Sequence, residues 1–98
     1  MPPVHDVAAS HPMVPEAGSV TVYVTSWCPY CSMLLRDLRA ESIPHTVVDV
    51  ERSTDADRAA AAVERINGGN RVVPTVVFAD GTTATNPGVD EVLLRMAR

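Results

Sequence analysis

The chain has 98 residues, a formal net charge of −4 at pH 7 and 46% hydrophobic residues. This length suits one small domain with a single core, and the composition is that of a soluble protein. The negative charge argues against a nucleic-acid-binding protein, which would carry a basic patch. No apolar run reaches the ~18 residues that a membrane-spanning helix needs.

The first nineteen residues, MPPVHDVAASHPMVPEAGS, are rich in proline and contain no apolar run. We therefore expect residues 1–19 to form a disordered extension. His5 and His11 lie in it, and we expect them to be solvated rather than bound to a metal. The segment lacks the basic start and hydrophobic stretch of a secretory signal, which favours a cytoplasmic location.

The first regular elements are expected from Val20 onward. The stretch VTVYVT (20–25) is β-branched and aromatic and predicts a strand. Pro29 is suited to the first turn of a helix, because the missing N–H has no partner there. Ile43-Pro44 would close this helix near residue 42. Its apolar face repeats at i, i+3, i+4 and i+7, and consists of Cys31, Leu34, Leu35 and Leu38.

A second strand and a second helix follow. TVVDV (46–50) predicts the strand, and Thr54 with Asp57 resembles a capping box at the start of the helix. NGGN (67–70) would end the helix with glycines that adopt positive φ. The expected buried face of this helix is Ala59, Ala62, Val63 and Ile66.

The last part of the chain predicts a hairpin and a third helix. Strands at 75–79 and 82–85 are joined by an Asp-Gly turn. Asn86-Pro87 resembles a cap followed by a helix-starting proline. The order β-α-β-α-β-β-α predicts an α/β domain over residues 20–98, with a parallel strand pair, an antiparallel hairpin and hence a central four-stranded mixed sheet flanked by helices.

Cys28 and Cys31, the only cysteines in the chain, allow three interpretations. A structural disulfide is disfavoured, because so short a loop restricts the unfolded chain little and cytoplasmic thiols are kept reduced. Structural zinc needs four ligands, and within the folded region only His45 could add one, unless a second chain supplies more. Thiol–disulfide exchange is favoured, because C-x-x-C beside a β-α-β pattern is its expected signature.

The predicted strand delivers Cys28 to the start of the helix. The N–H groups of Tyr30 and Cys31 lack helical partners there and would stabilise a thiolate. Such a thiolate also leaves a mixed disulfide readily. Cys31 lies one turn later and suits a resolving role, or is simply a small core residue. Trp27 and Tyr30 either wall this site or cover the edge of the core.

Residues 20–98 resemble the glutaredoxin branch of the thioredoxin superfamily through CPYC (28–31), NGGNRVVPT (67–75) and ADGTTATNP (79–87). The resemblance implies a thioredoxin-like fold of the glutaredoxin type, with a cis Val73-Pro74 bond beside Cys28. Val73 would then hold the substrate by strand-like hydrogen bonds. It also implies that Arg71 lies near a carboxylate of the thiol ligand, the alternative being a solvated loop residue.

The stretch ATNPGVDE (84–91) departs from glutathione-using members, which carry glycines where this chain has Thr85 and Asn86. Their hydroxyl and amide groups suit sugar hydroxyls better than a carboxylate. Together with TSWC, NGGNR and FADG, the stretch resembles the mycoredoxins, which use mycothiol, a thiol with a pseudo-disaccharide. The implied substrate-binding residues are Trp27, Pro29, Tyr30, Arg71, Val73, Pro74, Thr85 and Asn86.

The resemblance implies an enzyme whose Cys28 removes mycothiol from S-mycothiolated proteins, with mycothiol as the resolving thiol and mycothiol disulfide reductase acting indirectly. We expect a monomer with no bound cofactor or metal and no nucleic-acid or membrane partner. Two alternatives share the fold: a glutathione-linked glutaredoxin, and an electron-donor redoxin served by thioredoxin reductase that uses the Cys28–Cys31 disulfide. A metal or iron–sulfur carrier is an alternative of another class.

Overall fold

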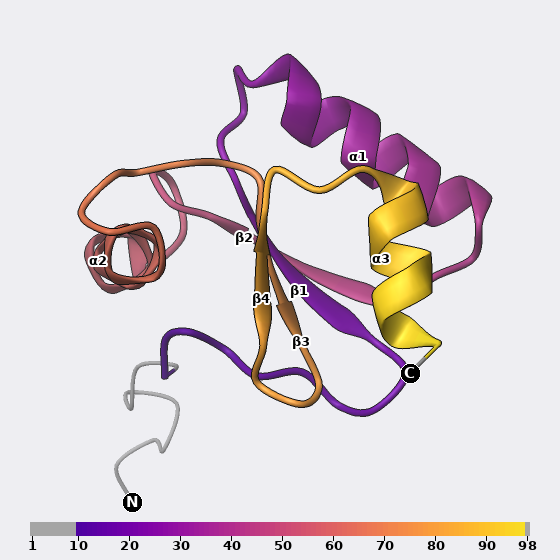
Figure 1. Cartoon of the computed structure of the whole chain (residues 1–98). Helices are drawn as coiled ribbons and strands as arrows, with labels where there is room; N and C mark the ends of the chain where they lie inside the picture. Colours follow the sequence, from indigo (N-terminus) through magenta and orange to yellow (C-terminus); the bar gives the residue numbers. More distant parts are fainter. Residues whose placement is uncertain (1–9, 98) are drawn as a thin grey trace, which may run out of the picture.

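A computed structural model describes residues 10–97 of the chain. The predicted order of elements, β-α-β-α-β-β-α, is confirmed (Figure 1). Most strand and helix ends lie within one or two residues of the predicted positions. The elements are β1 (Val20–Val24), α1 (Pro29–Ala40), β2 (His45–Asp49), α2 (Ala56–Ile66), β3 (Thr75–Phe78), β4 (Thr83–Thr85) and α3 (Val89–Met96).

The four strands form one mixed sheet in the order β2-β1-β3-β4. β1 pairs in parallel with β2, from Val20 opposite His45 to Val24 opposite Asp49. It pairs antiparallel with β3 on its other side, where Val20 lies opposite Phe78, and β3 pairs antiparallel with β4. This is the predicted thioredoxin-like arrangement, in which the parallel pair is connected through α1.

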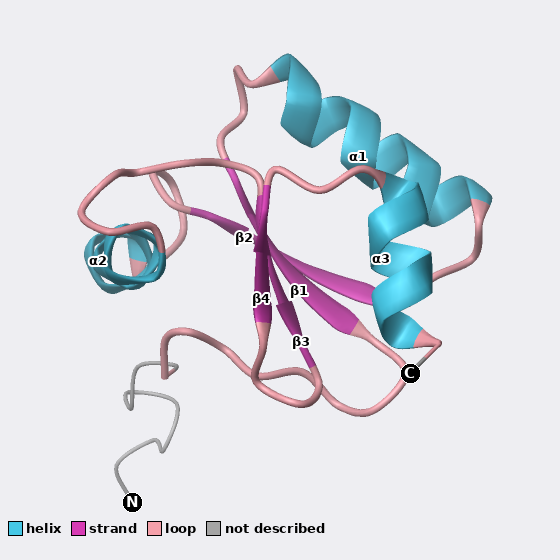
Figure 2. Ribbon diagram, viewed as in Figure 1, coloured by secondary structure: helices cyan, strands magenta, loops and turns pink. Residues whose placement is uncertain are grey.

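Helices cover both faces of the sheet, with α1 and α3 on one face and α2 on the other (Figure 2). Every residue of β1 is buried, as expected of a central strand enclosed on two sides. Leu34 and Leu38 of α1 and Val92 of α3 join the core under the first face. Tyr23 and Val63 belong to a second core under α2.

Two predicted helix starts are wrong. α2 begins at Ala56 with Asp55 as its N-cap residue and without a side-chain cap, so Thr54 and Asp57 form no capping box there. α3 begins at Val89 with Gly88 as N-cap, so Pro87 precedes the helix instead of starting it. Pro87 is buried and Asn86 has a positive φ of 50°, so this stretch forms a separate turn before the helix.

The described part of the N-terminal extension, residues 10–19, packs against the domain. The prediction that His11 is solvated is wrong: its side chain is 3% exposed and its Nδ1 lies 2.8 Å from the Tyr23 hydroxyl. The N–H of Met13 donates to the same hydroxyl at 2.7 Å, and the Met13 side chain packs on the second core. His5 lies outside the described residues.

The three helices in residues 10–97 are all too short or too polar to cross a membrane.

Candidate active site

Cys28 is the N-cap residue of α1 and lies four residues beyond Val24, the last residue of β1. Its backbone is extended, with φ −86° and ψ 116°, and Pro29 begins the helix as predicted. Strand and helix thereby present the Cys28 side chain to the unpaired N–H groups of the first helical turn. Both cysteines are free thiols, and both are buried.

The sulfur of Cys28 accepts a hydrogen bond from the Cys31 N–H at 3.4 Å. Cys31 is one of the two predicted donors. This contact and the positive end of the α1 dipole both favour a negative charge on the Cys28 sulfur. The position is therefore suited to a nucleophilic thiolate.

The loop before β3 meets the same sulfur from the other side. The Val73-Pro74 peptide bond is cis, as the family resemblance implied. The carbonyl oxygen of Val73 accepts a hydrogen bond from the Cys28 thiol at 3.8 Å, across 45 residues of sequence. The Val73 backbone therefore lies beside the Cys28 sulfur, as the family resemblance implied.

Cys31 is kept as a thiol. Burial raises its pKa to about 12, helped by the hydrogen bond to Cys28 and by the negative charges of Cys28 and Asp49. Cys31 is also part of the core under α1, only 1% exposed. The sulfurs of Cys28 and Cys31 thus have unequal environments. Cys28 is suited to attack, whereas Cys31 ionises only with difficulty.

Aromatic residues flank the site and lie largely in solvent. Trp27 is 68% exposed and Tyr30 is 61% exposed, so neither is buried over the core. The indole N–H of Trp27 donates to Glu51 Oε1 at 3.0 Å, which fixes the ring against the loop after β2.

A cavity of about 220 Å³ lies between α1 and the turn that leads into α3. It brings together Tyr30 and Asn86, which were predicted to bind substrate, and adds Asp37 as a charged neighbour. The remaining lining residues are Met33, Leu34, Pro87, Gly88 and Val89.

Thr85 is exposed, and its hydroxyl belongs to a polar cluster. Its hydroxyl donates to Asn67 Oδ1, and the Asn67 amide donates to Thr75 Oγ1 at 3.1 Å and to Val63 O at 2.8 Å. Asn86 is also exposed, and its N–H donates to Pro74 O at 2.7 Å. Asn67 was missed from the sequence, where NGGN signalled only the end of a helix.

Arg71 is held by an acidic residue of α2. Its Nε and Nη2 atoms both lie 3.1 Å from Glu64 Oε2. The sequence offered a ligand carboxylate or bulk solvent as its surroundings, and the contact with Glu64 was not foreseen. In residues 10–97, no three His, Cys, Asp or Glu side chains come together as a metal site.

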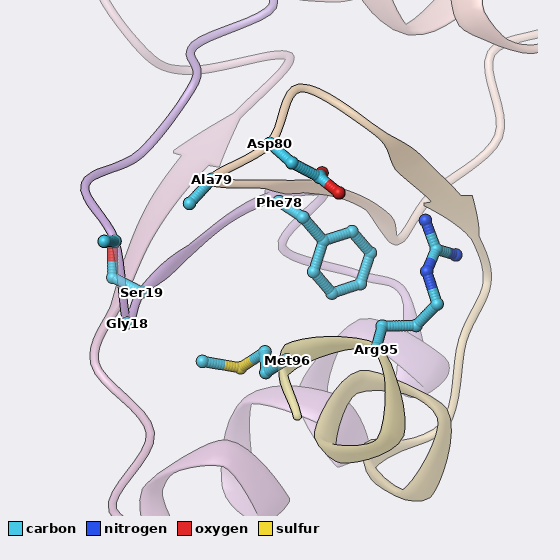
Figure 3. Close-up of a pocket in the computed structure, with 8 residues that line it drawn as sticks. Gly18, Ser19, Phe78, Ala79, Asp80, Arg95 and Met96 are labelled. Atoms are coloured by element: carbon cyan, nitrogen blue, oxygen red, sulfur yellow. The ribbon is translucent and has the colours of Figure 1, made fainter. Parts of the chain in front are cut away.

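A second cavity, of about 270 Å³, lies at the far end of β1 from Cys28, beside Phe78, which pairs with Val20 (Figure 3). Arg95 stacks on the Phe78 ring at 4.4 Å and donates to the Thr82 hydroxyl at 2.9 Å. These contacts satisfy Arg95 within the chain, so the cavity presents no unpaired cation to a ligand.

Comparison with known proteins matches residues 20–82 to the glutaredoxin family model. The chain belongs to the glutaredoxin family. This glutaredoxin is 49% identical over 82 residues to a protein of Mycobacterium tuberculosis that is named as a glutaredoxin, covering 83% of this chain and 93% of that one. It is 42% identical over 79 residues to Mycoredoxin 1 of Corynebacterium glutamicum, covering 81% and 94%.

Solved structures show the same fold. The glutaredoxin of Methanosarcina mazei superposes with a TM-score of 0.70 at 19% identity, covering 94% of this chain and 85% of that one. A glutaredoxin of Archaeoglobus fulgidus superposes with a TM-score of 0.65 at 25% identity, covering 83% and 87%. The chain is therefore a thiol–disulfide oxidoreductase of the glutaredoxin type, with its two cysteines at the start of α1.

Proposed function

We propose that this glutaredoxin reduces mixed disulfides between proteins and mycothiol, with Cys28 as the nucleophile and mycothiol as the resolving thiol. The observation that carries the proposal is the unequal pair of sulfurs. Cys28 Sγ accepts the Cys31 N–H at 3.4 Å, whereas burial raises the pKa of Cys31 to about 12. The 42% identity to Mycoredoxin 1 supports mycothiol as the partner.

The first step is attack of the Cys28 thiolate on the mycothiol sulfur of the mixed disulfide. The S–S bond to the client protein breaks, a new bond joins Cys28 to mycothiol, and the client thiolate leaves and takes a proton from water. Val73 O and the N–H groups at the start of α1 flank the reacting sulfur. Attack on the sulfur of the small thiol, not of the client, leaves the client reduced.

The second step needs an external thiol. A mycothiol thiolate attacks the mycothiol sulfur held on Cys28, mycothiol disulfide forms, and Cys28 departs as a thiolate stabilised by the Cys31 N–H. Cys31 competes poorly for this step, because a thiol with a pKa near 12 is almost wholly protonated at neutral pH. In the net reaction one free mycothiol is consumed, the client thiol is released and mycothiol disulfide forms, so the protein itself needs no bound cofactor.

The pseudo-disaccharide would lie in the cavity between α1 and the turn before α3. The exposed Asn86 side chain, the Tyr30 ring and the Asp37 carboxylate line this cavity. Amide and carboxylate groups are suited to hydroxyl groups of a sugar. Thr85 would contribute indirectly, because its hydroxyl is used to hold Asn67.

A coupled assay tests the donor. The reduced protein is given a mycothiolated client together with mycothiol and mycothiol disulfide reductase, glutathione and glutathione reductase, or thioredoxin reductase alone, each with NADPH. Turnover with the mycothiol system, and little with the others, is the expected result. Turnover with thioredoxin reductase alone would instead assign the protein to the redoxins that use the Cys28–Cys31 disulfide.

A further inference from the structure

We propose that Glu64 is a specificity-determining residue, which pairs with Arg71 and thereby lowers the affinity of the site for thiols and disulfides that carry carboxylates. Both nitrogen contacts of Arg71 go to one oxygen, Glu64 Oε2, at 3.1 Å. A guanidinium is the side chain best suited to bind a carboxylate in a forked geometry, and here the carboxylate comes from the chain itself.

Arg71 belongs to the loop that contacts the reacting sulfur. It precedes Val73 by two residues, and Val73 O contacts Cys28 Sγ. An unpaired guanidinium there would attract an anionic thiol or disulfide to Cys28. With Glu64 in place, the pair has no net charge and this attraction is largely lost.

Other carboxylates lie near the opening, and one of them, Asp37, is paired with Arg36 at 3.3 Å. Glu51 binds the indole of Trp27 beside Cys28, and Asp37 lines the cavity next to Tyr30. Asp90 lies in the first turn of α3, where a helix N-terminus would otherwise attract an anion. The Glu51 and Asp90 carboxylates would therefore weaken the binding of a partner with two carboxylates more than that of an uncharged, hydroxyl-bearing one.

This discrimination against carboxylates rests on the proposed function and deepens it. Mycothiol carries a sugar in place of charged amino-acid ends, so it would not be discriminated against. The Arg71 and Glu64 side chains are about half exposed, at 48% and 39%. An exposed pair of this kind changes an equilibrium by a factor of about two to five. The expected effect is therefore a graded preference, not an absolute barrier.

The test uses single-turnover oxidation of the reduced full-length protein by two disulfides, without mycothiol. One is glutathione disulfide, which is anionic, and the other is bis(2-hydroxyethyl) disulfide, which is uncharged. Loss of reduced protein is followed by mass spectrometry after acid quenching. Because no mycothiol is present, the outcome is independent of whether mycothiol is the physiological donor.

We expect Glu64→Gln to raise the rate constant with glutathione disulfide about two- to fivefold at low salt, and to leave the rate with the uncharged disulfide unchanged. The gain should disappear near 1 M salt, where screening acts within ~3 Å. Glu41→Gln is the matched control: it removes the same charge at the C-cap of α1, about 18 Å of helix from Cys28, and should have no effect.

The same substitution made in an Arg71→Gln protein distinguishes two possible effects of Glu64. One is its pairing with Arg71, and the other is its own negative charge. If Glu64 acts by occupying Arg71, Glu64→Gln gives no gain in that background. A gain of equal size with and without Arg71, equal gains with both disulfides, or no gain in the presence of Arg71 would overturn the proposal. Glu64→Ala repeats the measurement with a second side chain, and circular dichroism verifies that each variant is folded.

Discussion

The N–H of Cys31 points at Cys28 Sγ from 3.4 Å, while the Cys31 thiol itself is buried in the core beneath α1. The backbone of one cysteine thus supports the chemistry of the other, and its side chain is withdrawn from solvent. Replacing the Cys31 side chain leaves that N–H in place.

Cys28→Ser is therefore expected to reduce turnover in the mycothiol-coupled assay to the background rate, whereas Cys31→Ser retains it. The hydroxyl of serine is a far weaker nucleophile than a thiolate. Loss of turnover in Cys31→Ser, with Cys28 intact and the protein folded, would show that the reaction passes through the Cys28–Cys31 disulfide.

The raised pKa of Cys31 predicts a loss of stability in alkali under reducing conditions. The unfolded thiol ionises near its ordinary value of 9.0 and the folded thiol only near 12, so the stabilisation is complete below pH 9 and is lost as the pH rises toward 12. One proton gives a slope of at most about 1.4 kcal/mol per pH unit in the free energy of unfolding.

Urea unfolding of wild type and Cys31→Ala at several pH values above 9 measures this slope. Burial also raises the pKa of Tyr23, so both proteins are expected to lose some stability in alkali. The difference between the two slopes isolates Cys31. Parallel curves would contradict the prediction.

Tyr23→Phe is expected to lower the free energy of unfolding by about 1–3 kcal/mol, because it leaves the Met13 N–H and His11 Nδ1 without the hydroxyl that binds both. Tyr30→Phe provides the matched control, since the Tyr30 side chain is largely in solvent. Its effect should lie within about 0.5 kcal/mol. Equal effects of the two substitutions would mean that the contacts of residues 11–13 contribute nothing to stability.

Asn67→Ala is expected to lower the free energy of unfolding by about 1–3 kcal/mol, because the Asn67 amide joins α2 to Thr75 of β3 and Thr85 of β4. Asn70→Ala removes an exposed amide with a single contact of 3.5 Å and should change stability by less than about 0.5 kcal/mol. Denaturant unfolding of both variants measures the difference.

Local sequence patterns predicted the sheet and the position of Cys28 at the start of α1. The apolar spacing of Cys31, Leu34 and Leu38 is a strong helical signal, and all three are buried in the structure. Pro29 indicated the first helical position, and this placed Cys28 at the N-cap. Each of these inferences depends on neighbours within one or two helical turns.

Apart from the two helix starts, what the sequence missed concerns contacts between distant parts of the chain. The hydrogen bond between His11 and Tyr23 spans twelve residues, and the many prolines around His11 signal only that the segment is neither helix nor strand. Likewise, Arg71 meets Glu64 because the end of α2 faces the loop that follows it. Asn67 meets Thr75 and Thr85 because β3 and β4 pack side by side. Residue type alone does not specify such pairings.

The contacts of His11 and Met13 also bear on where this molecule can be cut. The glutaredoxin family match starts at residue 20. Met13 nevertheless packs among the apolar side chains beneath α2, and the Arg65 guanidinium donates a hydrogen bond to the His11 carbonyl at 3.1 Å. A shortened form that began at the family boundary would lose part of its own interior. For recombinant work, trimming should stop before residue 10, and any added tag belongs ahead of it.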